Sequence, residues 1–158
     1  MHINVLSIIV ASLVTLLTGF IWYNPKIFGT IWMLEAGITE EKMKKGNMIK
    51  IFSLTLFYSF LLSFIIAPAV NHEIGAMQAA GGNANDSALI DFLKIHHGRF
   101  LSFKHGALHG SMLGIFFALP IIAINSLFEQ KSWKYIAINA GYWILSLGIM
   151  GAIICGWQ

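Results

Sequence analysis

Uncharged apolar stretches alternate with charged connections along this chain. The stretches without Asp, Glu, Lys or Arg cover residues 3–23, 51–70, 106–128 and 135–157. Each reaches the roughly 20 residues that a helix needs to cross about 30 Å of hydrocarbon. They lack the polar and apolar alternation of a membrane β-barrel. The pattern therefore predicts an all-α polytopic membrane protein, a single domain over 1–158 with four transmembrane helices in a bundle, at about 3–23, 51–70, 104–128 and 133–157.

The two longer connections carry signs of short helices at the membrane surface. Residues 26–46 begin with an apolar stripe and continue with Thr39, a favoured N-cap residue that is followed by two glutamates. In the second connection, Asp86 precedes an amphipathic pattern, whereas the glycine-rich tract before it predicts no regular structure. We therefore expect interfacial helical segments at about 26–46 and 87–98.

Composition narrows the class of protein further. The chain is 57% hydrophobic and 11% charged, with a mean hydropathy of +0.73. A soluble domain carries about 25% charged residues, so a soluble globule is excluded. No nucleophile elbow, phosphate loop, Cys-x-x-Cys pair or dinucleotide fingerprint is present, and we expect the protein not to be an enzyme.

The positive charge is distributed unevenly over the connections. The formal charge is +3. One predicted side carries Lys26, Lys42, Lys44, Lys45, Lys50, Lys131 and Lys134, and the other carries Lys94, Arg99 and Lys104. This asymmetry predicts that the first side is cytoplasmic in a bacterial inner membrane and that both termini face outward, and it gives no indication of nucleic-acid binding. The aromatic anchors expected at the inner interface are Trp22, Tyr23, Trp32 and Trp133.

Small residues recur at four-residue spacing on the predicted spans. Helices in lipid gain no hydrophobic advantage from mutual contact, so they associate through small residues that let backbones approach. The positions are Gly106, Gly110 and Gly114 on the third span, Ser59 and Ser63 on the second, and Gly148 and Ala152 on the fourth. We expect these positions to be the helix-packing faces, and we expect Pro120 to kink the third span.

A polar seam runs along the fourth span at membrane depth. Asn139, Tyr142 and Ser146 follow one helical face and would be costly against lipid. One interpretation is a path for a solute or a proton. The other is hydrogen bonding between helices, which is favoured because no carboxylate accompanies the three residues.

Histidines gather at the start of the third span. His105 and His109 are spaced i, i+4, so their rings share one helical face and suit a metal ion. His96 and His97 precede them and either could complete the site, with Asp91 as a carboxylate ligand or as a hydrogen-bond partner of a ligand. A transition metal or haem is one interpretation. The other, which the sequence favours, is a neutral, hydrogen-bonded structural role, since an H-x-x-x-H pair is common and adjacent histidines cannot easily reach one ion.

Two motifs support a family resemblance. They are GFIWYNP at 19–25, continuing through Gly29 and Trp32, and FKHGALHG at 103–110, followed by NAGYW at 139–143. With them, the chain resembles the small bacterial integral-membrane family catalogued as domain of unknown function 1761. The resemblance implies a four-helix membrane protein and assigns no activity.

These observations leave three functional hypotheses. The first, which the sequence favours because it has small-residue packing faces and lacks catalytic motifs, is a protein that acts by association, as a homo-oligomer or as an accessory subunit of a larger membrane complex. The second is a metal- or haem-binding membrane protein that uses the histidine cluster. The third is a carrier of a small solute or ion along the polar seam.

Overall fold

The computed structural model describes residues 4–158, and this part of the chain is helical and contains no strand. Four helices are long and apolar enough to cross a membrane, which confirms the predicted fold class. They are α1 (Val5–Trp22), α4 (Met48–Val70), the composite span Phe103–Phe128 and α9 (Trp133–Gly156). The composite span consists of α7 (Phe103–Leu113), η2 (Gly114–Ala118) and α8 (Leu119–Phe128). Residue 3, where the first span was expected to begin, lies outside the described residues.

Side-chain caps set where the spans begin. Asn47 accepts a hydrogen bond from the Lys50 amide, so α4 starts three residues before the uncharged stretch. Ser102 and Ser132 cap α7 and α9 in the same way. The first amides of a helix have no partner within the helix, and these oxygens supply one.

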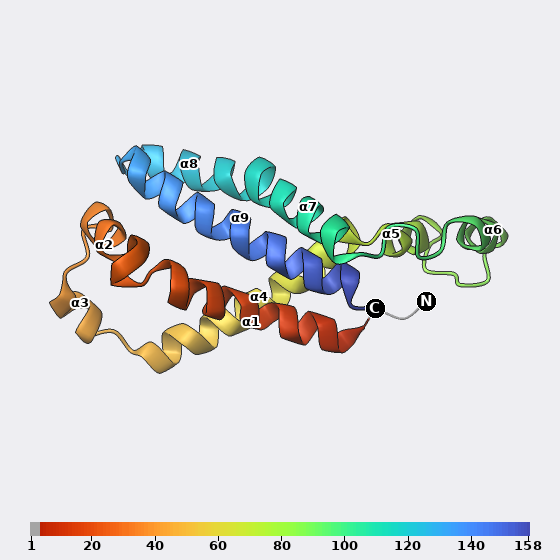
Figure 1. Cartoon of the computed structure of the whole chain (residues 1–158), viewed down its shortest axis with the longest axis horizontal. Coiled ribbons are helices and arrows are strands. Elements are labelled where there is room, and N and C mark those ends of the chain that lie inside the picture. Colours follow the sequence, from red (N-terminus) through yellow and green to blue (C-terminus); the bar gives the residue numbers. More distant parts are fainter. Residues whose placement is uncertain (1–3) are drawn as a thin grey trace.

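In the bundle, α9 lies between α1 and the α7–α8 span (Figure 1). The C-terminus lies at the same end as α5 (His72–Ala79) and α6 (Ser87–His96), which extend beyond the bundle. The opposite end carries α2 (Thr30–Ala36), α3 (Glu40–Lys44) and the turn from α8 to α9. There the Lys131 ammonium donates to the Ala36 carbonyl at 3.1 Å, which ties the first connection to this turn.

The connections contain the two expected helical segments and one helix that the pattern does not predict. The first connection folds as η1 (Pro25–Gly29), α2 and α3, with Thr39 capping α3. In the second, the Asp86 carboxylate caps α6 at the Leu89 amide, 2.9 Å away. The unpredicted helix is α5, which is short and has no apolar face. It forms because Asn71 ends α4 and caps α5 at the Glu73 amide.

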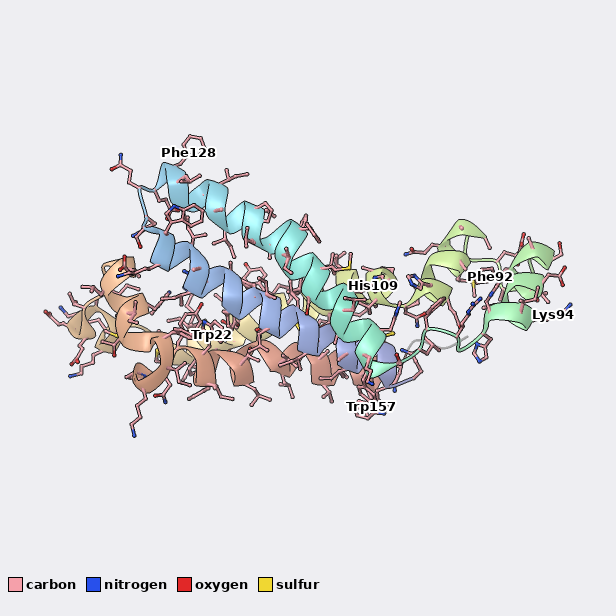
Figure 2. The ribbon with its side chains drawn as sticks, turned by 45° about the horizontal axis from the view of Figure 1, so that its top comes forward. Trp22, Phe92, Lys94, His109, Phe128 and Trp157 are labelled. Atoms are coloured by element: carbon pink, nitrogen blue, oxygen red, sulfur yellow. The ribbon has the colours of Figure 1, made fainter. Side chains whose placement is uncertain are left out.

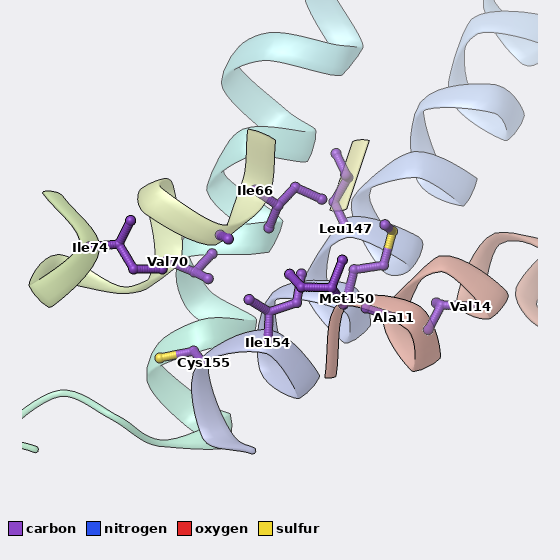
Figure 3. Close-up of a cluster of buried hydrophobic side chains, with 11 residues drawn as sticks. Ala11, Val14, Ile66, Val70, Ile74, Leu147, Met150, Ile154 and Cys155 are labelled. Atoms are coloured by element: carbon purple, nitrogen blue, oxygen red, sulfur yellow. The ribbon is translucent and has the colours of Figure 1, made fainter. Parts of the chain in front are cut away.

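A buried apolar cluster joins α1, α4, α5 and α9 (Figure 3). Its members are Ile8, Ala11, Val14, Ile66, Ala67, Val70, Ile74, Leu147, Met150, Ile154 and Cys155. Ser59 and Ser63 of α4 are buried as well, and Ser59 forms a hydrogen bond with Thr15 of α1. Burial of these hydroxyls is tolerated because each has a partner inside the bundle.

The α7–α9 interface is a direct contact between backbones. A Cβ atom on Gly106 would lie 2.1 Å from the Gly151 carbonyl oxygen, and one on Gly110 would lie 2.1 Å from the Leu147 carbonyl oxygen. Any side chain at these positions would therefore push the helices apart.

On α9, the contact face departs from the predicted four-residue spacing. Gly148 packs against Ser111, and the next glycine in contact with α7 is Gly151; Ala152 is half-buried. The physical reason is that an α-helix has 3.6 residues per turn, so steps of three and four alternate along one face.

The third span is not a continuous α-helix. The π-helical turn η2 begins at Gly114, which packs against Ile144, and it ends two residues before Pro120. Proline lacks an amide hydrogen and crowds the carbonyl four residues earlier, here that of Phe116 within η2. The irregularity expected at Pro120 thus takes the form of a wide turn before it.

Candidate metal centre

Three histidines converge where α4 ends and α7 begins. Each offers one ring nitrogen, and these atoms of His72, His105 and His109 all lie within 4.8 Å of one another. The Nε2 atoms of His72 and His105 are 3.0 Å apart. The ring centroids are separated by 4.3 Å for His105 and His109, 4.9 Å for His72 and His105, and 5.1 Å for His72 and His109. Figure 2 shows His109 on α7, at the end of the bundle nearest α5.

Two helix starts position these rings. The Ser102 hydroxyl accepts the His105 amide and begins α7, so His105 and His109 lie one turn apart on one face. On the other side, Asn71 turns the chain from α4 into α5, whose first residue is His72. The cluster therefore depends on a contact between segments separated by 33 residues.

Phe100 forms an aromatic wall beside the cluster. Its ring stacks on His105 with a centroid separation of 5.1 Å and an interplanar angle of 29°, and it meets the His72 ring edge-on at 5.6 Å. The Phe100 carbonyl accepts a hydrogen bond from the Cys155 thiol at 3.3 Å, so the wall is anchored to α9. Contacts of this kind limit the rotation of the two imidazoles.

The geometry suits a single small ion. A tetrahedral zinc ion with bonds of 2.0–2.1 Å to nitrogen places its ligand atoms about 3.3 Å apart. The His72 and His105 nitrogens are already near this spacing, and a turn of the His109 ring brings in the third. His72 is exposed and the other two are half-buried, so the site opens to the surface.

The other predicted ligands lie outside this cluster. The His97 Nδ1 atom lies 3.1 Å from the Glu73 carboxylate, and the Asp91 carboxylate accepts a hydrogen bond from Lys94 at 2.8 Å. His96 packs against Phe92 with ring centroids 4.8 Å apart. Glu73 engages His97, and His96 packs on its own helix beside the cavity that His72 lines, so neither ring joins the three clustered imidazoles.

The sequence pattern does not single out His72, although a signal for it exists. His72 lies two residues after the predicted end of the second span, and His105 stands at the predicted start of the third. Consecutive spans are antiparallel, so these two positions must meet the same face of the membrane. Comparing the histidines at those span ends that lie on the same side of the membrane would have grouped His72 with His105.

Two cavities border the cluster. One of about 270 Å³ contains His72 in its wall, and the rest of its lining is Asn71, Glu73, Phe92, His96, Arg99, Phe100 and Leu101. The other, of about 250 Å³, contains His109 in its wall and is otherwise lined by Ala69, Met112, Leu113, Phe116 and Phe117. The first cavity provides space for water beside the imidazoles.

The polar seam of α9 is paired with α1. The Tyr142 hydroxyl donates to the Thr15 carbonyl at 2.9 Å, and the Ser146 hydroxyl lies 2.7 Å from that of Thr18. The Asn139 carbonyl oxygen accepts from Tyr23 at 3.0 Å. These contacts support the interhelical interpretation, and they take up the groups that a carrier would need to line a wet path.

The aromatic anchors divide into two kinds. The Trp22 indole donates to the Ile138 carbonyl at 3.0 Å, and the ring of Tyr23 lies 5.0 Å from that of Trp32, so these residues join the first connection to the bundle. Burial raises the pKa of Tyr23 above its usual range. Trp133 is exposed, as expected for a residue that faces the membrane interface.

Comparison with known proteins gives one match. The family model described as "Protein of unknown function (DUF1761)" covers residues 6–155. No curated protein and no solved structure matches the chain. The match includes His72, His105 and His109 and all four candidate spans except the first residue of α1 and the last of α9.

Proposed function

We propose that this chain, which belongs to the DUF1761 family of proteins of unknown function, is a membrane protein that binds a transition-metal ion through His72, His105 and His109. The observation that carries the proposal is the convergence of three imidazole nitrogens from two separate segments. Imidazole is a favoured ligand of zinc, copper, nickel and iron, and three such ligands leave a fourth position for water.

The ligand set favours reversible binding. The cluster contains neither a thiolate nor a carboxylate, so an ion held there keeps its full positive charge and is bound by neutral nitrogens alone. The exposure of His72 gives the ion a direct route from water. Both features suit a protein that takes up an ion at one face of the membrane and releases it again.

A single ion fits the arrangement better than haem. The three rings touch one another, with centroids 4.3–5.1 Å apart, and the nitrogens approach one point. A porphyrin held between two of these imidazoles would need a slot as wide as the macrocycle. The contacts among the rings fill that space.

The proposed location is the bacterial cytoplasmic membrane, with both termini and the metal site on the outer side. The support is the distribution of charge: the bundle end with α2 and α3 carries seven lysines, and the metal end carries two lysines and one arginine. Single cysteines introduced at Lys42 and at Lys94 of a Cys155→Ser background test the orientation. Only the cysteine at Lys94 should react with an impermeant reagent in intact cells, and labelling at Lys42 alone would reverse the topology.

Association with a second copy or a larger complex is the competing hypothesis. It draws on the exposed apolar faces of α4 and of the α7–α8 span. Lipid satisfies such faces equally well, and no contact among the described residues favours a protein partner. We therefore retain association as an outcome of the metal experiment, not as the leading function.

The direct experiment is metal titration of the protein purified in detergent. Calorimetry and elemental analysis with Zn²⁺, Co²⁺, Ni²⁺ and Cu²⁺ should give about one ion per chain for at least one of these metals. Co²⁺ adds a spectroscopic readout, because tetrahedral coordination produces strong visible absorption. Replacing any one of the three clustered histidines by Ala should abolish stoichiometric binding.

The matched control is His96, whose ring packs against Phe92 of its own helix. His96→Ala removes the same side chain from the neighbouring segment, and the cluster should still bind one ion. A wild-type protein that takes up no metal, or equal losses in His96→Ala and His105→Ala, would overturn the proposal. If the metal-free wild type also forms a stable oligomer, the association hypothesis replaces it.

A further inference from the structure

We infer that Glu73 is a positioning residue for the proposed metal site, and that it couples occupancy of the site to the docking of residues 97–102 against α5. The inference rests on the proposed function. Glu73 is the sequence neighbour of His72, yet its carboxylate contacts the segment that leads to His105. The Glu73 side chain thus connects the segment that carries His72 with the segment that leads to His105.

Glu73 is the buried carboxylate among the described residues, with 6% of its surface exposed. A carboxylate removed from water requires partners, and two are present. The Gly98 amide donates to Glu73 Oε1 at 2.7 Å, and His97 Nδ1 lies 3.1 Å from the carboxylate. Hydrogen bonds to an ionised acceptor are among the stronger ones in proteins.

The backbone at His97 and Gly98 explains this contact. His97, the C-cap residue of α6, leaves the helical conformation with a ψ of 133°, and the peptide that follows points the Gly98 amide at Glu73 of α5. Gly98 has a φ of +74°, in the left-handed region that favours glycine, which turns the residues after it. The chain then continues through Phe100, whose ring stacks on His105, into the start of α7.

The contacts form a closed loop around the cluster. His72 meets His105, Phe100 contacts both rings, and the Glu73 carboxylate holds the segment that carries Phe100. Loss of the carboxylate removes the tie between this segment and α5, although Cys155 still holds the Phe100 carbonyl, so the ion must supply more of the relative placement of His72 and His105. Partners that orient metal ligands typically contribute about 10- to 100-fold in affinity.

Linkage makes the effect reciprocal. If docking of residues 97–102 favours metal binding, metal binding must favour docking to the same extent. Metal should therefore slow amide hydrogen exchange in residues 97–102. A purely structural role for Glu73 would change stability without making this protection depend on metal.

The experiment compares Glu73→Ala, Glu73→Gln and the control Asp91→Asn in the full chain, with Zn²⁺ titration and hydrogen exchange. Asp91 is an exposed carboxylate in the same connection between the second and third spans, and it is paired with Lys94. We expect the Kd for Zn²⁺ to rise about 10- to 100-fold in Glu73→Ala. The rise should be smaller in Glu73→Gln, because its amide oxygen still accepts a hydrogen bond from the Gly98 amide. The Kd should stay unchanged in Asp91→Asn.

The outcomes separate this inference from the proposed function. A wild type without metal binding removes both. Wild-type affinity in Glu73→Ala, or metal that leaves exchange in residues 97–102 unchanged in the wild type, overturns the inference and leaves the metal site standing. Exchange in α9 reports whether the bundle is intact in each variant, and if Glu73→Ala fails to fold, Glu73→Gln must still show a raised Kd.

Discussion

Two faces of α7 differ in whether they leave room for a ligand: the glycine face, formed by Gly106 and Gly110, and the histidine face, formed by His105 and His109. Gly106 and Gly110 bring the α7 backbone directly against α9, so no space remains. His105 and His109, each one residue before a glycine of that face, turn toward His72 and keep ring nitrogens available. The same four-residue spacing thus serves packing on one side of a helix and ligand presentation on the other. A rigid contact on the first face holds the second in place.

The polar seam of α9 provides a third point of comparison. Its groups are as polar as imidazoles, yet their hydrogen-bonding capacity is used by α1. Polarity on a membrane-spanning helix therefore does not by itself mark a ligand site. What distinguishes the histidines is that ring nitrogens from two segments converge, and that His72 and His105 pair with each other instead of with a neighbouring helix backbone.

The largest expected effect comes from closing the glycine face. In Gly110→Ala, the added methyl would lie 2.1 Å from the Leu147 carbonyl oxygen. Forced separation of α7 and α9 should lower the free energy of unfolding by about 3 kcal/mol, and metal binding should be lost with the fold. Thermal unfolding in detergent measures the first effect, and Zn²⁺ titration the second.

The control for this variant is Gly75→Ala on α5, where an added Cβ meets nothing within 4 Å. It should leave stability unchanged or raise it by about 0.5–1 kcal/mol, because alanine is the better helix former. Equal stability of the two variants would contradict the close contact between α7 and α9.

Removing a metal ligand from the histidine face should weaken metal binding strongly and change stability little. In His105→Ala we expect the affinity for Zn²⁺ to fall more than about 100-fold, since a ligand matters more than the residues that orient it. The free energy of unfolding of the metal-free protein should fall by no more than about 1–2 kcal/mol, because one exposed hydrogen bond and the stacking on Phe100 are lost. Calorimetric titration and thermal unfolding in EDTA give the two values. A large loss of stability in EDTA would indicate that the cluster is structural.

A smaller effect is expected in the polar seam. Ser146→Ala removes the hydroxyl that pairs with Thr18, whose own hydroxyl keeps a hydrogen bond to the Val14 carbonyl. The cost should be about 0.6–1 kcal/mol, with Zn²⁺ affinity unchanged. Unfolding in detergent at increasing denaturant measures it. A change in metal affinity without a change in stability would connect the seam to the site, against this account.

The smallest effect should follow from the surface of α6. Asp91 and Lys94 form an exposed ion pair one helical turn apart. Asp91→Asn should change the free energy of unfolding by less than about 0.5 kcal/mol and leave metal affinity unaltered. A clear loss of Zn²⁺ binding in this variant would return Asp91 to the site as a ligand.

The sequence predicts the spans well because their signal is local. Apolar length defines a membrane helix without reference to other segments, and caps such as Thr39 and Asp86 act within four residues. Two of the three clustered histidines are also local, since His105 and His109 share one helix. The prediction that His96 or His97 supplies the third ligand relied on nearness in the sequence.

The remainder depends on tertiary contacts. His72 reaches His105 only because Asn71 ends one helix and begins another, and because α7 packs against α9 through glycines. The helix α5 lacks a periodic apolar face, so the sequence pattern does not predict this helix. The π-helical turn at Gly114 likewise depends on the adjacent helix as well as on Pro120, so local propensity alone does not specify it.

X-ray absorption at the zinc edge, recorded on protein loaded with one equivalent of Zn²⁺, tests the central claim most directly. The account predicts three imidazole ligands with nitrogen at about 2.0–2.1 Å, completed by one oxygen, and the loss of imidazole scattering in His72→Ala. A sulfur ligand, a shell of oxygen alone, or a spectrum that is unchanged in His72→Ala would contradict it.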